Sequence, residues 1–156
     1  FEENIKQYLS KNNSVKQYEL VNNPAESYVI KCLEKVEHVI GISAVTEDND
    51  PNGHLGKAGG YTATVYFTCD WVNQANVIGN TIIDKGTDGG GAIEVYANVE
   101  DAESRDSYLA GFDGGVLASG SHTVVGTCVV RTSDELAASK QKELEAAVIG
   151  ALTKLE

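Results

Sequence analysis

A chain of 156 residues with 42% hydrophobic and 22% charged residues has the composition of one soluble globular domain, and not of a disordered or fibrous protein. Its formal net charge of −11 argues against nucleic-acid binding, because nucleic-acid-binding proteins neutralise phosphates with Lys and Arg. The same charge repels anionic lipid and suits calcium or a basic partner.

The chain has no apolar run near the ~20 residues that a membrane helix needs, so we expect no direct insertion into a membrane. It begins at Phe1 and contains no Met, which predicts a processed chain whose leader lay upstream. The three cysteines are odd in number and lack CxxC spacing, so we expect no zinc site and no complete disulfide framework. Cys32, Cys69 and Cys128 each lie in an apolar stretch and are predicted to be buried thiols.

Hydrophobic periodicity and turn residues divide the chain into alternating helices and strands. In chain order we predict a short helix and linker at 1–23, a helix at 24–37, strands at 39–46 and 60–68, an irregular segment at 69–90 with a short edge strand as an option, a strand at 92–98, a helix at 99–112, a strand at 121–131 and a C-terminal helix. The glycine-rich residues 85–91 are predicted to be a flexible loop.

Two helix starts carry capping signals. Asn98 precedes Glu100 and Asp101, and a side-chain oxygen at the cap with acidic residues in the first turn favours a helix there. Thr132 and Glu135 have the spacing of a capping box, which predicts that the last helix begins beside them.

The predicted fold is α+β. The unit from strand 92–98 through a helix to strand 121–131 is long enough for a right-handed parallel crossover. Together with the other strands it predicts a two-layer sandwich of ferredoxin-like character, in which a mixed four-stranded sheet has its helices packed on one face. Residues 24–156 would form this single domain, after the N-terminal segment 1–23.

The other face of that sheet would be exposed and rich in Tyr and Thr. Such a face suits stacking on a sugar or a peptide, or pairing of two subunits in a homodimer. The alternative is that Thr and Tyr are there because they suit strands. The residues predicted on this face are Thr62, Thr64, Tyr66, Glu94 and Tyr96.

The loop before the second strand carries a partial calcium motif. Asp48, Asp50 and Asn52, followed by Gly53, match the first six positions of an EF-hand loop, and His54 would offer its backbone carbonyl. The twelfth position is Gly59 in place of the bidentate Glu, so a complete EF-hand is excluded. An incomplete calcium site and a turn-rich hairpin loop remain as alternatives.

No catalytic or cofactor-binding residues are predicted. Cys128 and His122 lie six residues apart on one predicted strand, roughly 20 Å, and therefore cannot form a nucleophile–base pair. The glycines at 86–91 lack the Lys-Ser/Thr that a phosphate loop needs. A non-enzymatic binding domain is the preferred interpretation. The alternatives are a calcium-dependent binding or adhesion module that uses the 47–60 loop, and a hydrolase-type enzyme with a site assembled from distant residues.

Four stretches carry a family resemblance: 45–63, 100–110, 119–127 and 131–136. Together they resemble a family of Gram-positive lipoproteins and membrane-anchored surface proteins, sometimes labelled EbhA-like. The resemblance covers about residues 25–150 and implies a domain tethered outside the membrane by an anchor upstream of Phe1. It implies no activity, and it leaves the partner unknown.

Overall fold

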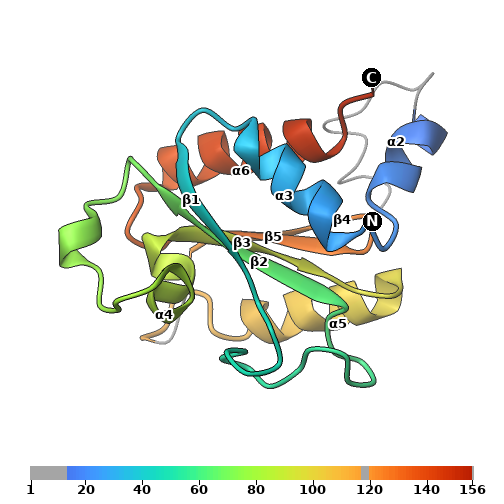
Figure 1. Cartoon of the computed structure of the whole chain (residues 1–156), viewed down its shortest axis with the longest axis horizontal. Coiled ribbons are helices and arrows are strands. Elements are labelled where there is room, and N and C mark those ends of the chain that lie inside the picture. Colours follow the sequence, from blue (N-terminus) through green and yellow to red (C-terminus); the bar gives the residue numbers. More distant parts are fainter. Residues whose placement is uncertain (1–13, 117–119, 156) are drawn as a thin grey trace.

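The computed structural model of this chain describes residues 14–116 and 120–155. A five-stranded sheet lies at its centre, with the strands in the order β1-β2-β3-β5-β4 (Figure 1). Every neighbouring pair of strands is antiparallel. The strands are β1 (Val39–Ala44), β2 (Ala63–Cys69), β3 (Gly90–Val95), β4 (His122–Val125) and β5 (Cys128–Thr132).

Helices cover both faces of this sheet. In Figure 1, α3 and α6 lie on one side of the strands and α5 lies on the other side, with the short α4 near β1 and β2. The helices are α2 (Ser14–Leu20), α3 (Glu26–Glu34), α4 (Ile82–Lys85), α5 (Val99–Ala110) and α6 (Ala138–Leu152), with short 3-10 turns at Gln74–Asn76 and Gly86–Gly89.

The predicted α+β class is confirmed, but three finer predictions are wrong. The sheet is antiparallel rather than mixed, it has five strands rather than four, and its helices lie on both faces rather than one. The fifth strand arises because the predicted strand 121–131 is a hairpin. Gly126 turns the chain there with φ 62°, a left-handed conformation that glycine adopts without strain. The likeness to ferredoxin-like sandwiches stays a prediction.

The predicted crossover is present, but the two strands that it connects are not neighbours, because β5 lies between them. Both β3 and β4 pair antiparallel with β5, so they run in the same direction with β5 between them, and α5 connects them. The edge strand offered for residues 69–90 is absent, since that fully described segment forms only turns and short helices before β3.

The glycine-rich residues 85–91, predicted to be a flexible loop, have regular structure instead: Gly86–Gly89 form a 3-10 turn, and β3 begins at Gly90. Gly90 and Gly91 are buried and belong to β3. A Cβ atom added to Gly91 would lie 2.2 Å from the carbonyl oxygen of Arg131, which no side chain tolerates. Glycine is therefore required here by the close approach of β5.

One of the two capping predictions is confirmed. The side chain of Asn98 accepts a hydrogen bond from the backbone N–H of Asp101 at 2.9 Å and caps α5. The capping box is wrong, because Thr132 belongs to β5 and the Glu135 N–H donates to Ser133 Oγ at 3.0 Å instead. Helix α6 begins only at Ala138.

The main core lies between the sheet and the pair α3 and α6. Its fully buried side chains are apolar, and each contributes about 1.5–3 kcal/mol by leaving water. The three cysteines are buried in this core and form no disulfide bond, as predicted, and burial raises the pKa of Cys128 to about 12. The largest buried side chains here are Leu33, Val65, Phe67, Ile93, Leu144, Ile149 and Leu152.

The described part of the predicted N-terminal linker packs on the domain. Residues 14–20 form α2, and Val21 is fully buried, with its carbonyl accepting a hydrogen bond from Thr127 N at 2.8 Å. Gln17 Nε2 also donates to the carbonyl of Thr153 at 2.9 Å. The helix predicted near the start of the chain falls on residues 1–13, outside the described residues.

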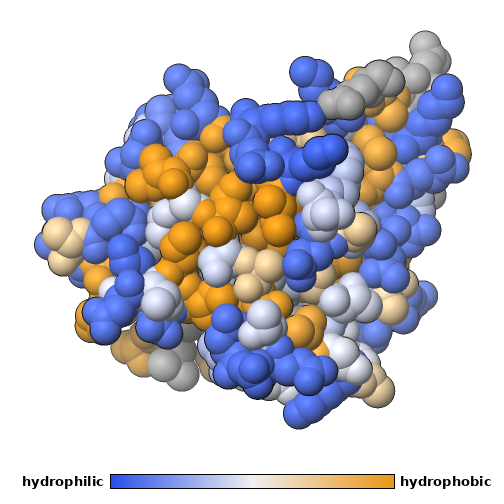
Figure 2. All heavy atoms as spheres, viewed as in Figure 1, coloured by the Kyte–Doolittle hydropathy of each residue, from blue (hydrophilic) through white to orange (hydrophobic). Residues whose placement is uncertain are grey.

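Strand β1 stands at one edge of the sheet and carries apolar side chains. Ile40 is 58% exposed, and Val39, Ile42 and Ala44 are half-buried. Figure 2 shows a hydrophobic area in the middle of this view, bordered by hydrophilic residues. Within 14–116 and 120–155, no helix has both the length and the apolar character to cross a membrane.

Candidate functional site

The sheet face predicted to be exposed is largely buried. Thr64 and Glu94 are 0% exposed, Tyr66 is 3% and Tyr96 is 2%, while Thr62 alone is exposed. The exposure prediction is wrong for these four residues because a second layer, which contains α4 and α5, covers them. As a flat surface for a sugar, a peptide or a second subunit, this face is not accessible.

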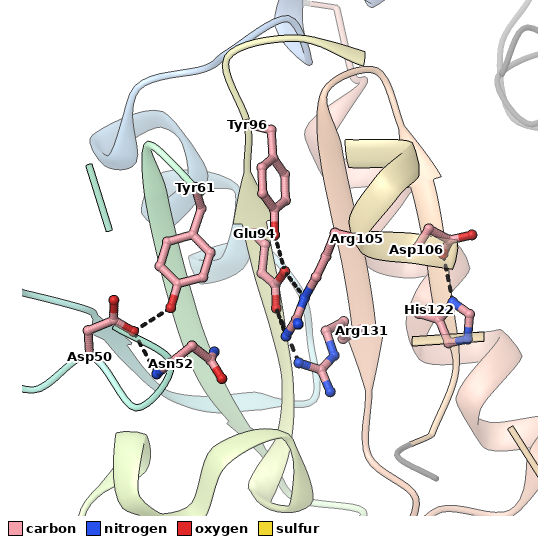
Figure 3. Close-up of polar contacts among 9 residues, drawn as sticks. All are labelled: Asp50, Asn52, Tyr61, Glu94, Tyr96, Arg105, Asp106, His122 and Arg131. Carbon is pink, nitrogen blue, oxygen red and sulfur yellow. Dashed lines mark hydrogen bonds and ion pairs between the residues drawn. The ribbon is translucent and has the colours of Figure 1, made fainter. Parts of the chain in front are cut away.

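A buried carboxylate with two guanidinium partners lies at the centre of this face (Figure 3). Glu94 Oε1 accepts hydrogen bonds from Arg105 Nε at 2.9 Å and from the Tyr96 hydroxyl at 2.6 Å. Its Oε2 accepts from Arg105 Nη2 at 3.3 Å and from Arg131 Nη1 at 3.1 Å. The Arg105 and Arg131 side chains are only 12% and 9% exposed. We call these four residues the Glu94 cluster.

The Glu94 cluster holds its charges firmly. Burial lowers the pKa of Arg105, but the charge and hydrogen bond of Glu94, together with the Tyr96 and Tyr66 hydroxyls, outweigh it, so the net direction is upward. Burial and the Glu94 carboxylate both raise the pKa of Tyr96, so its phenol stays protonated at neutral pH. Two guanidinium groups therefore share one carboxylate, and the cluster carries one positive charge in excess.

An open cavity of about 790 Å³ lies against the cluster. Arg131 comes from β5 and Tyr96 directly follows β3, and the 50–59 loop forms the opposite wall with Pro51, Asn52, His54 and Gly59. In Figure 3 the Asn52 side chain is turned from the loop toward Arg131. Helix α5 and the turn after it contribute residues spaced three or four apart, namely Asp101, Ser104, Arg105, Tyr108, Leu109 and Phe112.

Asp50 organises the loop wall of this cavity. Its carboxylate accepts hydrogen bonds from the backbone N–H groups of Asn52, His54 and Leu55 at 3.0, 2.8 and 2.8 Å, and from the Tyr61 hydroxyl. Burial alone would raise the pKa of Asp50, but these four donors outweigh it and lower the pKa to about 2. The loop is thus shaped by its own aspartate, the usual role of Asp in turns.

This hydrogen bonding accounts for the partial calcium motif without an ion. Asp50 is already satisfied by four donors, and Asp48 is an exposed residue of the same loop. Within the described residues, no group of three or more His, Cys, Asp or Glu side chains is placed to hold a metal ion. Calcium binding through Asp48, Asp50, Asn52 and His54 stays a prediction.

Residues predicted for two separate sites meet at one place. Asn52 and His54, predicted for the metal loop, line the same cavity as Tyr96, predicted for the binding face. Sequence reasoning missed Arg105 and Arg131, which supply the charge of the cavity. One signal was present: Arg131 ends an otherwise apolar strand, and the charged Glu94 lies in the middle of another, so an ion pair between them could have been expected.

A histidine ties the α5 wall of the cavity to the sheet. His122 Nδ1 lies 2.6 Å from an Asp106 carboxylate oxygen, and Nε2 lies 3.0 Å from Asp113 Oδ2. Asp106 follows Arg105 on α5, and His122 is the strand partner of Arg131. The Asp106 hydrogen bond raises the pKa of His122, burial opposes this, and Asp113 adds to the rise. His122 therefore links the elements that carry both arginines.

No protein-family model matches this chain, and no curated protein or solved structure matches it significantly.

Proposed function

We propose that this chain is a non-enzymatic, extracytoplasmic binding domain that holds a small ligand between α5 and the 50–59 loop. The observation that carries the proposal is the convergence of Arg105 and Arg131 on Glu94 beside a cavity of about 790 Å³. Cavities of this size, roughly 300–1,000 Å³ with a few convergent polar groups, are typical of small-molecule sites. The location outside the membrane rests on the lipoprotein resemblance alone.

The chemistry of the cluster favours binding over catalysis. General acid–base catalysis needs a group that changes its protonation near the working pH. Arg105 and Tyr96 stay protonated because their pKa values are raised, and both oxygens of Glu94 already accept hydrogen bonds. Fixed charges and fixed donors of this kind orient a ligand without exchanging protons with it.

The walls of the cavity are held by contacts that need no ligand. Asn98 caps α5, His122 ties it to the sheet, and Asp50 fixes the loop opposite. A site that is already ordered loses less conformational entropy when a ligand enters, and so binds more tightly for the same contacts.

A blocking variant tests the proposal. Ser104 is an exposed residue of α5 that lines the cavity, so Ser104→Trp should fill the cavity without disturbing the core. Ser107→Trp on the same helix, outside the lining, is the matched control. A fragment library screened by ligand-observed NMR should give binders that S104W loses and S107W keeps. Fragments that bind both variants equally, or no binders at all, would contradict the proposal.

A further inference from the structure

We infer that the ligand of this cavity is a singly charged organic carboxylate with an aromatic or apolar group, anchored by Arg105 and Arg131. The inference rests on the proposed function, because it concerns the same cavity. It follows from three features: the excess charge of the Glu94 cluster, the order of side chains along α5, and the position of Asp101.

The excess charge calls for an anion. Two guanidinium groups share the single carboxylate of Glu94, and the arginine side chains are 12% and 9% exposed, so water screens their charges poorly. Guanidinium groups match planar carboxylates with paired, charge-assisted hydrogen bonds, as they already do around Glu94. A second carboxylate, brought by the ligand, would complete a two-to-two arrangement.

The order of side chains along α5 places the rest of the ligand. Tyr108 lies about one turn beyond Arg105, and Phe112, about one turn further along the chain, also lines the cavity. The Arg105 guanidinium carbon lies 5.6 Å from the centre of the Tyr108 ring, and the Tyr108 and Phe112 rings meet edge to face at 5.1 Å. An apolar group attached to the carboxylate would pack on these rings.

Asp101 limits the ligand to one negative charge. It lines the cavity about 6 Å along α5 from Arg105, on the side away from the aromatic rings. Only one positive charge is in excess, so the second charge of a phosphate monoester would stay unmatched and be repelled by Asp101. We therefore expect a monoanionic carboxylate to bind better than a phosphate.

Four probes of similar size test this on the wild-type chain: 3-phenylpropionate, 3-phenylpropionamide, 3-phenylpropylamine and phenyl phosphate. Titrations followed by NMR should show 3-phenylpropionate binding at least about tenfold more tightly than each of the others. If the amide binds as tightly as the carboxylate, the cavity binds ligands but the inference is wrong. If no probe moves the signals of the cavity residues, both the inference and the proposed function fail.

Arg105→Gln removes one of the two guanidinium charges beside Glu94 and leaves the Arg131 ion pair with Glu94 in place. In this variant 3-phenylpropionate and 3-phenylpropionamide should bind with about equal affinity, and the affinity for the amide should be the same as in the wild type. The control is Glu103→Gln, which changes an exposed charge of α5 outside the cavity lining and should keep the preference. Tyr108 is 60% exposed, so Tyr108→Ala should fold and weaken both probes alike. A preference that survives R105Q overturns the inference.

Discussion

The two faces of one sheet differ in what holds them. Along β3, Ile93 and Val95 pack into the apolar core under α3 and α6, while Glu94 points to the opposite side and forms ion pairs. The alternation of side chains along a strand lets the same residues build both faces. The α3/α6 face is closed by apolar packing alone, whereas the α5 face combines two smaller apolar clusters with directional contacts between charges.

This difference separates stability from recognition. Apolar burial stabilises a fold wherever side chains fit. Burying an ion pair costs the hydration free energy of both charges, and their mutual attraction offsets this cost only when the geometry of the pair is good. Replacing such pairs by apolar residues is often neutral or stabilising. The Glu94 cluster is therefore hard to explain as a route to stability, and its place beside a cavity supports a role in binding.

The largest effect is expected on the charged face. Glu94→Ala leaves two poorly exposed guanidinium groups without their shared carboxylate, so the free energy of unfolding should fall by about 3–5 kcal/mol. Urea denaturation followed by circular dichroism measures this, with the exposed Glu103→Ala as control. A decrease in the free energy of unfolding below about 1 kcal/mol would mean that water solvates the arginines and that the ion pairs do not stabilise this face.

A comparable or slightly smaller effect is expected on the apolar face, without an effect on binding. Leu144 is 1% exposed in the α6 core, so Leu144→Ala should cost about 2–5 kcal/mol through the cavity it leaves. The affinity for 3-phenylpropionate, measured where the variant is folded, should stay within about twofold of wild type. A large change in affinity would show that the two faces are energetically coupled.

A smaller, pH-dependent effect should appear only on the charged face. The pKa of His122 is raised in the folded chain above its unfolded value of 6.5. Protonated His122 therefore contributes its full share to the free energy of unfolding below pH 6.5, and this contribution is lost as the pH rises through the folded pKa. The wild type should therefore lose stability across that window relative to His122→Gln. Parallel urea titrations at a series of pH values measure the difference. Asp106, Asp113, Glu145 and Arg131 surround the imidazole and are unchanged in both proteins.

The smallest effect is expected from calcium. A ligand at about 100 times its dissociation constant adds about 2.7 kcal/mol to stability. Because Asp50 already accepts four hydrogen bonds, thermal melts in calcium, magnesium and EDTA should overlay. A midpoint raised by calcium alone, and no longer raised in Asp50→Ala, would instead make the 47–60 loop a metal site.

Local signals predicted the elements whose causes are local. Strand β2 follows from its β-branched and aromatic residues, and the Asn98 cap from a side chain three residues before its donor. The hairpin in 121–131 is not evident from the sequence because its turn, Gly126 and Thr127, is only two residues long and lies inside an apolar run. The second layer is not evident from the sequence because α5 is held by contacts between distant residues, such as Glu94 with Arg105. The hydrophobic periodicity of a segment carries no information about such contacts.

The candidate site was predicted in pieces. The sequence predicts Asn52 and His54 for a metal loop and Tyr96 for a binding face. No pattern in the sequence indicates that the three residues line one cavity. The alternating pattern predicts that Glu94 is exposed, because a polar residue in such a strand normally lies on the solvent-facing side. Only the partner, Arg131 on β5, distinguishes a buried pair from an exposed charge.

The most direct test of the central claim is a chemical-shift map of the chain titrated with 3-phenylpropionate. The claim is that the charged face binds the ligand and the apolar face only stabilises the fold. We predict that the backbone signals of Asn52, His54, Ser104 and Tyr108 move, while those of Val148 and Ile149 in α6 do not. Shifts confined to the α3/α6 side, or none at saturating ligand, would contradict it.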